Sequence, residues 1–254
     1  RAATLCKADL ASELVGEFPS LQGVVGRLYA TEQGEDPEVA QAIDEHWMPR
    51  GENAPLPENP SGILVSLSDK VDNLISFFSI GFKPTSSSDP YALRRQVLGV
   101  IKILIKGEYS LPLDEVMKGC YDAFCKRIPN ETKKEVSTAN ELLKEIKVFF
   151  ENRVKTVFQD FNLEKDEIEA SLSSGFNDIY DTFCRAKALH HFRKNNEKFL
   201  LLYEVYRRAK GQLAKQEEVG FSEKFLQKDE EKSLHHKPGE IERQLTQVVE
   251  KHQY

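Results

Sequence analysis

The residues of this sequence best suited to chemistry are basic ones that can bind phosphate. Arg94 and Arg95 stand side by side in DPYALRRQ (89–96), and a guanidinium can bind phosphate oxygens through two parallel hydrogen bonds, which lysine cannot do. A second basic group lies near Tyr203 and Tyr206, whose rings could stack on a base or simply pack. The candidate phosphate-binding residues are Lys83, Arg94, Arg95, Lys102 and Lys106, and then Arg207, Arg208 and Lys210.

Two amphipathic helices within 62–106 are expected to position the first set. Asp89-Pro90 is a start signal for the second helix, because the carboxylate can accept orphan N–H groups and the proline suits the first helical position. Arginines in the first turn gain nothing from the helix dipole, which favours a contact role. Apolar residues recur at helical spacing, namely Leu67, Val71, Leu74 and Phe78, and then Leu93, Val97, Val100, Ile101 and Leu104.

Acidic residues of the same region leave two alternatives open. Asp69 and Asp72 lie three residues apart on the first helix, so both carboxylates project from similar sides. Either arginine could form an internal ion pair with Asp69, Asp72 or Asp89 that holds the two helices together. Both charged pairs could equally be solvated surface.

Composition bounds the class of protein. The 254 residues suit one large or two medium domains, and 40% hydrophobic residues with 15 Phe and 8 Tyr can fill a sizeable core. A net charge of −6 argues against non-specific nucleic-acid binding through the overall field. A local basic patch can still bind nucleic acid, because binding depends on the face that is presented.

The cysteines and the hydropathy pattern indicate an intracellular setting. No CxxC occurs, and the cysteines lack paired spacing with histidines, so we expect reduced thiols of the cytosol rather than disulfides or a zinc site. No apolar run approaches the roughly 20 residues of a membrane span. The chain starts without Met, and we interpret it as a fragment of a longer protein. The cysteines are Cys6, Cys120, Cys125 and Cys184.

Period-two alternation is almost absent, so the sequence predicts an all-α fold. Gly23 and Gly26 cost helix propensity, and we expect another backbone or a ligand against that face. IPNET (128–132) suggests a domain boundary, which gives domains 1–130 and 131–254. Pro238-Gly239 is expected to split the last helix. The other expected helices cover 2–16, 21–28, 37–48, 110–127, 137–159, 164–173, 176–193 and 196–216.

The remaining candidates favour structural roles. His46 beside Trp47 could stack on a base, but packing is favoured. His190 and His191 are adjacent and cannot chelate together on a helix, and His235-His236 suits an exposed turn. No cysteine has a candidate base at a recognisable spacing, and neither a P-loop nor GxGxxG occurs.

Several segments together resemble the β subunit of the bacterial heterotetrameric glycyl-tRNA synthetase. DPYALRRQ (89–96) and EFPSLQG (17–23) are the most specific, and the resemblance is strong over 1–105 and weaker to about 215. Gly211 stands where the family has asparagine. The segments are CKADLASELVGEFPSLQGVVGRLYA (6–30), GEDPEVAQAIDEHWMPR (34–50), LP (56–57), SLSDKVDNL (66–74) and IGFKPTSSSDPYALRRQVLGVIKIL (80–104).

The resemblance implies an HD-like helical domain, followed by a helical region leading into an incomplete anticodon-binding module. In HD phosphohydrolases a His-Asp pair and a later Asp hold divalent metal. Here Asp9 and Asp69 keep the aspartates, but alanine takes the histidine's place. A metal site needs several convergent ligands. We therefore expect a degenerate HD site with no catalytic residue and no metal.

The resemblance also implies a function. It suggests the RNA-binding, non-catalytic part of a cytoplasmic glycine–tRNA ligase, an oligomer that uses ATP and Mg elsewhere. The implied partners are tRNA(Gly) and the α subunit, with neither DNA nor a membrane. One alternative is a structural spacer between subunits that does not touch RNA, and another is a working HD-type phosphohydrolase. The predicted RNA-binding residues are Lys83, Arg94, Arg95, Lys102, Arg207 and Arg208.

Overall fold

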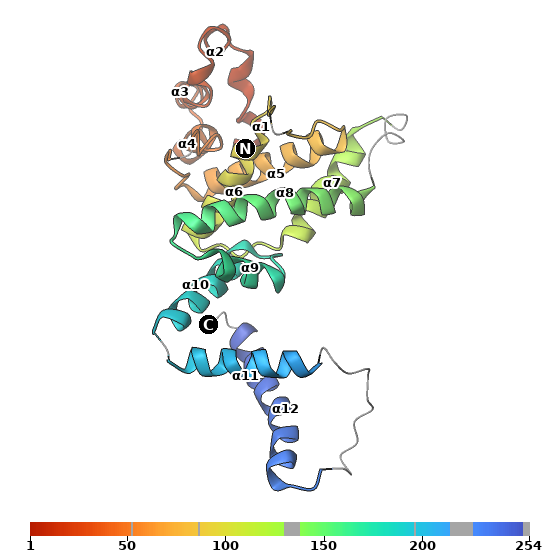
Figure 1. Ribbon diagram of the computed structural model, residues 1–254. Helices are drawn as coiled ribbons and strands as arrows, with labels where there is room; N and C mark the ends of the chain where they lie inside the picture. Colours follow the sequence, from red (N-terminus) through yellow and green to blue (C-terminus); the bar gives the residue numbers. More distant parts are fainter. Residues whose placement is uncertain (52, 86, 130–137, 196, 214–225, 251–254) are drawn as a thin grey trace. The chain divides into compact units, whose positions relative to one another are not determined.

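The protein is helical, as the sequence predicts. The computed structural model describes residues 1–51, 53–85, 87–129, 138–195, 197–213 and 226–250 (Figure 1). Within these ranges every regular element is a helix, and the only β pairing is an isolated bridge between Thr85 and Ser88. The all-α prediction is confirmed. By its internal contacts the chain divides into two compact units, Arg1–Thr182 and Phe183–Tyr254.

The N-terminal segment is broken into short pieces, so the prediction of one helix over 2–16 is wrong. Ser12 interrupts it: its backbone is extended, and its hydroxyl accepts the N–H of Val15 at 3.3 Å, which caps a new helix. The break also turns Asp9 inward. The elements are α1 (Ala2–Leu5), the 3-10 turns η1 (Ala8–Ala11) and η2 (Pro19–Leu21), α2 (Glu13–Glu17) and α3 (Val24–Glu32).

Helices α3 and α4 (Pro37–Glu45) pack closely against each other. Asp36 caps α4 by accepting the N–H of Glu38 at 2.8 Å, and Pro37 follows at the first position. A Cβ on Gly26 would lie 2.7 Å from Cγ2 of Ile43, too close for any larger residue. The sequence predicts another backbone or a ligand against this glycine, but the nearest atoms are side-chain atoms of Ile43 and Asp9.

The core of the first unit lies around α5 (Pro60–Ser79), which contacts α4, α6, α7 and α8 (Figure 1). Both apolar stripes that periodicity predicts face this core, with only Leu67 half-buried. The remaining helices of the unit are α6 (Leu93–Gly107), α7 (Leu113–Arg127), α8 (Ala139–Asp160) and α9 (Lys165–Ser173). Its largest fully buried side chains include Phe150, Phe158, Ile75, Ile101, Leu104 and Leu142.

The described residues that follow form α10 (Ile179–Asn195), α11 (Glu197–Leu213) and α12 (Asp229–Glu250). The predicted split at Pro238 is wrong, because α12 continues through that proline. A proline removes one intrahelical hydrogen bond, and Gly239 follows it directly, but the rest of α12 is rich in residues that favour helix, such as Glu, Lys and Leu.

The predicted break at 128–132 falls partly on residues 130–137, which lie outside the described ranges. Because α8 packs against α5, α6 and α7, the first compact unit extends to Thr182. The division into domains 1–130 and 131–254 stays a prediction. In the part of the chain that is described, no helix combines the length and apolar character required to cross a bilayer.

Candidate nucleic-acid interface

The start of α6 is fixed by Asp89. Its Oδ1 accepts the N–H of Leu93 at 2.8 Å, and its Oδ2 accepts the N–H of Arg94 at 3.0 Å. These bonds satisfy two of the orphan donors at a helix start. The predicted role of the carboxylate is therefore confirmed. Pro90 does not occupy the first helical position, because the chain passes through a left-handed residue, Ala92, before the helix begins at Leu93.

We expect Asp89→Ala to lower the free energy of unfolding by about 1 kcal/mol, the usual cost of losing a capping side chain. Urea denaturation monitored by circular dichroism measures this change. Asp89→Asn, which keeps one acceptor oxygen, should recover part of the loss. Equal stabilities for wild type and Asp89→Ala would show that the carboxylate does not cap α6.

Arg94 braces the loop before its own helix. Its guanidinium donates to the carbonyl of Thr85 and lies 3.8 Å from the Asp89 carboxylate. The alternative of an internal ion pair thus holds for Arg94 with Asp89, although the pair does not join α5 to α6. Burial and, next, the nearby Arg94 lower the pKa of the Arg153 guanidinium on α8, so positive charge accumulates here.

Arg95 is placed differently. Its side chain is exposed, and it has no ion pair or side-chain hydrogen bond to any described residue. A cavity of 560 Å³, here called the basic cavity, is lined by Arg95 together with Arg94, Lys102 and Arg50. Asp89, already engaged as the cap of α6, also lines it. The structure therefore brings three of the predicted residues to one concave surface.

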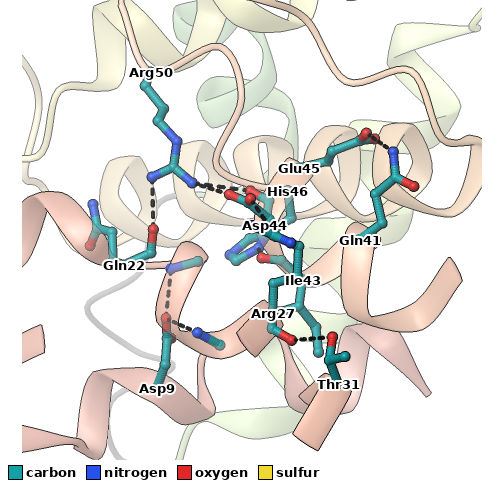
Figure 2. A network of polar contacts seen from close by, with 12 residues as sticks. Asp9, Gln22, Arg27, Thr31, Gln41, Ile43, Asp44, Glu45, His46 and Arg50 are labelled. Carbon is teal, nitrogen blue, oxygen red and sulfur yellow. Dashed lines mark hydrogen bonds and ion pairs between the residues drawn. The ribbon is translucent and has the colours of Figure 1, made fainter. Parts of the chain in front are cut away.

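Arg50 was not predicted. It donates to the carbonyl of Gln22 at 2.7 Å and forms an ion pair with Asp44, which also pairs with Arg27 at 3.1 Å (Figure 2). These contacts hold the loop after α4 against the segment before α3. Arg50 lies in an irregular loop where no periodicity links it to Arg95, so the sequence offers no signal for it.

The other predicted basic residues lie elsewhere. Lys83 forms an ion pair with Glu145 of α8 at 2.6 Å and lines a separate cavity of 170 Å³. Lys106 is exposed in the last turn of α6. In the second unit Arg207 and Arg208 are exposed on α11, and Arg208 lies 3.8 Å from Glu204.

Asp9 and Asp69 have separate partners. Asp9 is buried, and its Oδ2 accepts the N–H of Gly23 at 2.6 Å and of Gly26 at 3.1 Å at the start of α3 (Figure 2). Asp69 forms an ion pair with Lys7 and accepts a bond from the amide of Asn73 at 3.2 Å. Within the described ranges, no three or more His, Cys, Asp and Glu side chains gather as a metal would need.

Two further titratable groups, His46 and Lys70, lie close to Asp69. His46 is fully buried, which confirms the packing interpretation, and its Nδ1 lies 2.6 Å from the carbonyl of Ile43. Burial is the main cause that lowers the pKa of His46, so the imidazole is neutral at pH 7. Lys70 is also buried, and its ammonium donates to the carbonyl of His46 at 3.0 Å and to Oγ of Ser66 at 2.7 Å.

Comparison with known proteins places the chain in a family. The family model described as glycyl-tRNA synthetase beta subunit matches residues 1–173. The glycine–tRNA ligase beta subunit of Desulforamulus reducens is 38% identical over 254 residues, which are 100% of this chain and 36% of the relative. The corresponding subunit of Syntrophomonas wolfei is 43% identical over 205 residues, 80% of this chain and 29% of the relative.

The beta subunit of Halalkalibacterium halodurans is 39% identical over 238 residues, 92% of this chain. It is likewise longer than the chain, which covers 33% of it. The chain thus spans about a third of the length of these curated relatives. It belongs to the glycyl-tRNA synthetase β subunit family.

Proposed function

We propose that this chain is an RNA-binding, non-catalytic part of a glycine–tRNA ligase β subunit. It would hold tRNA(Gly) in position while glycine is joined to the RNA elsewhere in the enzyme. That reaction would use ATP and Mg. The whole enzyme would also contain an α subunit. The observation that carries this proposal is the basic cavity, where Arg95 has no partner among the described residues.

The chemistry of the basic cavity suits a phosphate backbone. Arg50 and Arg94 each pair with a carboxylate, whereas Arg95 is exposed and has no ion pair among the described residues. Such contacts position RNA without reading its sequence. Holding two reactants in register lowers the entropic cost of their reaction, so a subunit can support catalysis without touching the reacting atoms. The net charge of −6 makes this local surface, rather than the whole molecule, the source of affinity.

The HD-like positions support a binding role better than hydrolysis. One oxygen of Asp9 already accepts two backbone N–H groups, and the Asp69 carboxylate is neutralised by the Lys7 ammonium. The other oxygen of Asp9, Oδ1, is buried and has no hydrogen-bond partner among the described residues, but it is a single ligand, and a cation at Asp69 would have to displace Lys7. The residues present therefore do not fit a metal site, and we derive no metal-dependent step.

Replacing Arg95 tests the proposal. At low salt we expect Arg95→Ala to weaken binding of tRNA(Gly) by about tenfold, and to reduce the slope of log K against log[salt] by about one. Electrophoretic mobility shifts across a salt series measure both. Lys118→Ala removes the same charge from an exposed site on α7 that does not line the basic cavity, and should leave binding unchanged. Equal loss in the two variants, or no loss in either, would overturn the proposal.

A second candidate, a scaffold between subunits, is favoured by exposed apolar side chains within the first 29 residues. Leu10, Phe18, Leu28 and Tyr29 are between 45% and 57% exposed, and clustered exposed apolar groups mark protein interfaces. Two results together would favour this role: Phe18→Ser abolishes association with an α subunit, and Arg95→Ala leaves RNA binding unchanged. A cytoplasmic location, an oligomeric whole enzyme and RNA contacts from Arg207 and Arg208 remain parts of the same proposal.

A further inference from the structure

A second cavity, here called the inner cavity, opens beside the basic cavity. Its volume is 400 Å³, within the range of about 300–1,000 Å³ typical of small-molecule sites. It shares Arg50 and Arg95 with the basic cavity, but Lys70, Gln96 and Trp47 line only the inner one. Residues from the α4–α5 loop, α5 and the start of α6 therefore line one cavity that is partly open to solvent.

Charge in the inner cavity is unbalanced toward positive. Asp69 is paired with Lys7, and Arg50 is paired with Asp44. The Lys70 ammonium has only neutral partners, a carbonyl and a hydroxyl, and it is 5% exposed. A buried cation that no carboxylate contacts directly is costly; the nearby Asp69 offsets part of that cost, and an anion of the right size would relieve the rest.

Two neutral side-chain nitrogens of the lining residues also have no hydrogen-bond partner among the described residues, Nε2 of His46 and Nε1 of Trp47. The side chain of His46 is 0% exposed. Since Nδ1 donates its proton to the carbonyl of Ile43, Nε2 of the neutral ring is an acceptor. A hydroxyl group is the complementary partner. The rings of Trp47 and Tyr91 supply flat apolar walls to the same cavity.

We propose that the inner cavity binds one nucleotide unit, with its phosphate beside Lys70 and Arg95, a sugar hydroxyl toward His46 and its base against an aromatic wall. The unit is either a free nucleotide or one residue of an RNA strand that also crosses the basic cavity. The second case deepens the proposed function and rests on it. The shared chemistry is a phosphate, a hydroxylated sugar and a flat base.

Trp47 is the only tryptophan of the chain, so its fluorescence reports on this cavity directly. We expect saturable quenching when the full chain is titrated with AMP, and weaker effects from inorganic phosphate or adenosine alone. Gln96→Glu places a negative charge in the inner cavity and should weaken AMP binding at least tenfold. Lys102→Glu alters only the basic cavity and should leave AMP binding within twofold of wild type.

A 5′-phosphorylated RNA trinucleotide identifies the source. If the trinucleotide binds more tightly than AMP, and both Gln96→Glu and Lys102→Glu lose trinucleotide binding, the site belongs to an RNA residue. If AMP binds more tightly than the trinucleotide, the site belongs to a free nucleotide. Absence of saturable quenching, or AMP binding unchanged in Gln96→Glu, overturns this inference. If the inner cavity fails these tests but Arg95→Ala and Lys102→Glu still lose tRNA binding, the proposed function stands and only the nucleotide inference is wrong.

Discussion

Replacing Asp9 with alanine is expected to lower the free energy of unfolding by about 3 kcal/mol, because two N–H groups at the start of α3 would lose their common acceptor inside the protein. The loss of a negative charge at a helix N-terminus adds to the cost. Chemical denaturation at pH 7, followed by circular dichroism, measures the change.

Asp69→Ala is the matched control. Asp69 is also an HD-like position, but its ion pair with Lys7 is partly exposed and should contribute less than about 1 kcal/mol. Asp9→Asn retains one oxygen acceptor and should fall between the two. If Asp9→Ala and Asp69→Ala cost the same small amount, Asp9 does not carry the structural role assigned to it.

Lys70 should make the stability of the protein rise with pH above about pH 8. Its burial, opposed in part by Asp69, lowers the pKa of the ammonium from 10.5 to about 8. Between these values the unfolded chain holds a proton that the folded protein has released, so raising the pH favours the folded state. The full gain is about 3 kcal/mol between pH 7 and pH 10.5, at 1.36 kcal/mol for each pKa unit.

Comparison of wild type with Lys70→Met isolates this contribution. The difference in unfolding free energy between them should shift in favour of wild type as the pH rises from 7 to 10, because other titrating groups are common to both. Lys118→Met removes an exposed lysine and should give a difference independent of pH. A Lys70→Met difference that is equally flat would mean that Lys70 is not buried as a cation.

Most of the fold follows from local pattern. The stripes of α5 and α6 are predictable because each helix buries one face against several neighbours, so period and burial agree. The N-terminal segment is not predictable in this way. There the contact of Asp9 with Gly23 and Gly26, remote in sequence, and the cap by Ser12 override helical periodicity.

The candidate site is predictable only in part. Neighbouring residues on a helix project about 100° apart, so Arg94 bonds its own loop and lines only the basic cavity, while Arg95 lines both cavities. Residue type alone does not separate the two. Lys70 could have been found from its spacing, because it lies four residues after Ser66 and four before Leu74 on the buried face. Arg50 could not, since only the folded loop brings it to the basic cavity.

The central claim is that RNA lies in the basic cavity, and photo-crosslinking from inside that cavity tests it most directly. Leu98 lines the cavity, and Val148 is 60% exposed on α8 outside it. With benzoylphenylalanine at position 98, irradiation should link the chain to tRNA(Gly), and excess salt should suppress the product. Crosslinking from position 148 alone, or none from position 98 under conditions where tRNA is bound, would contradict the claim.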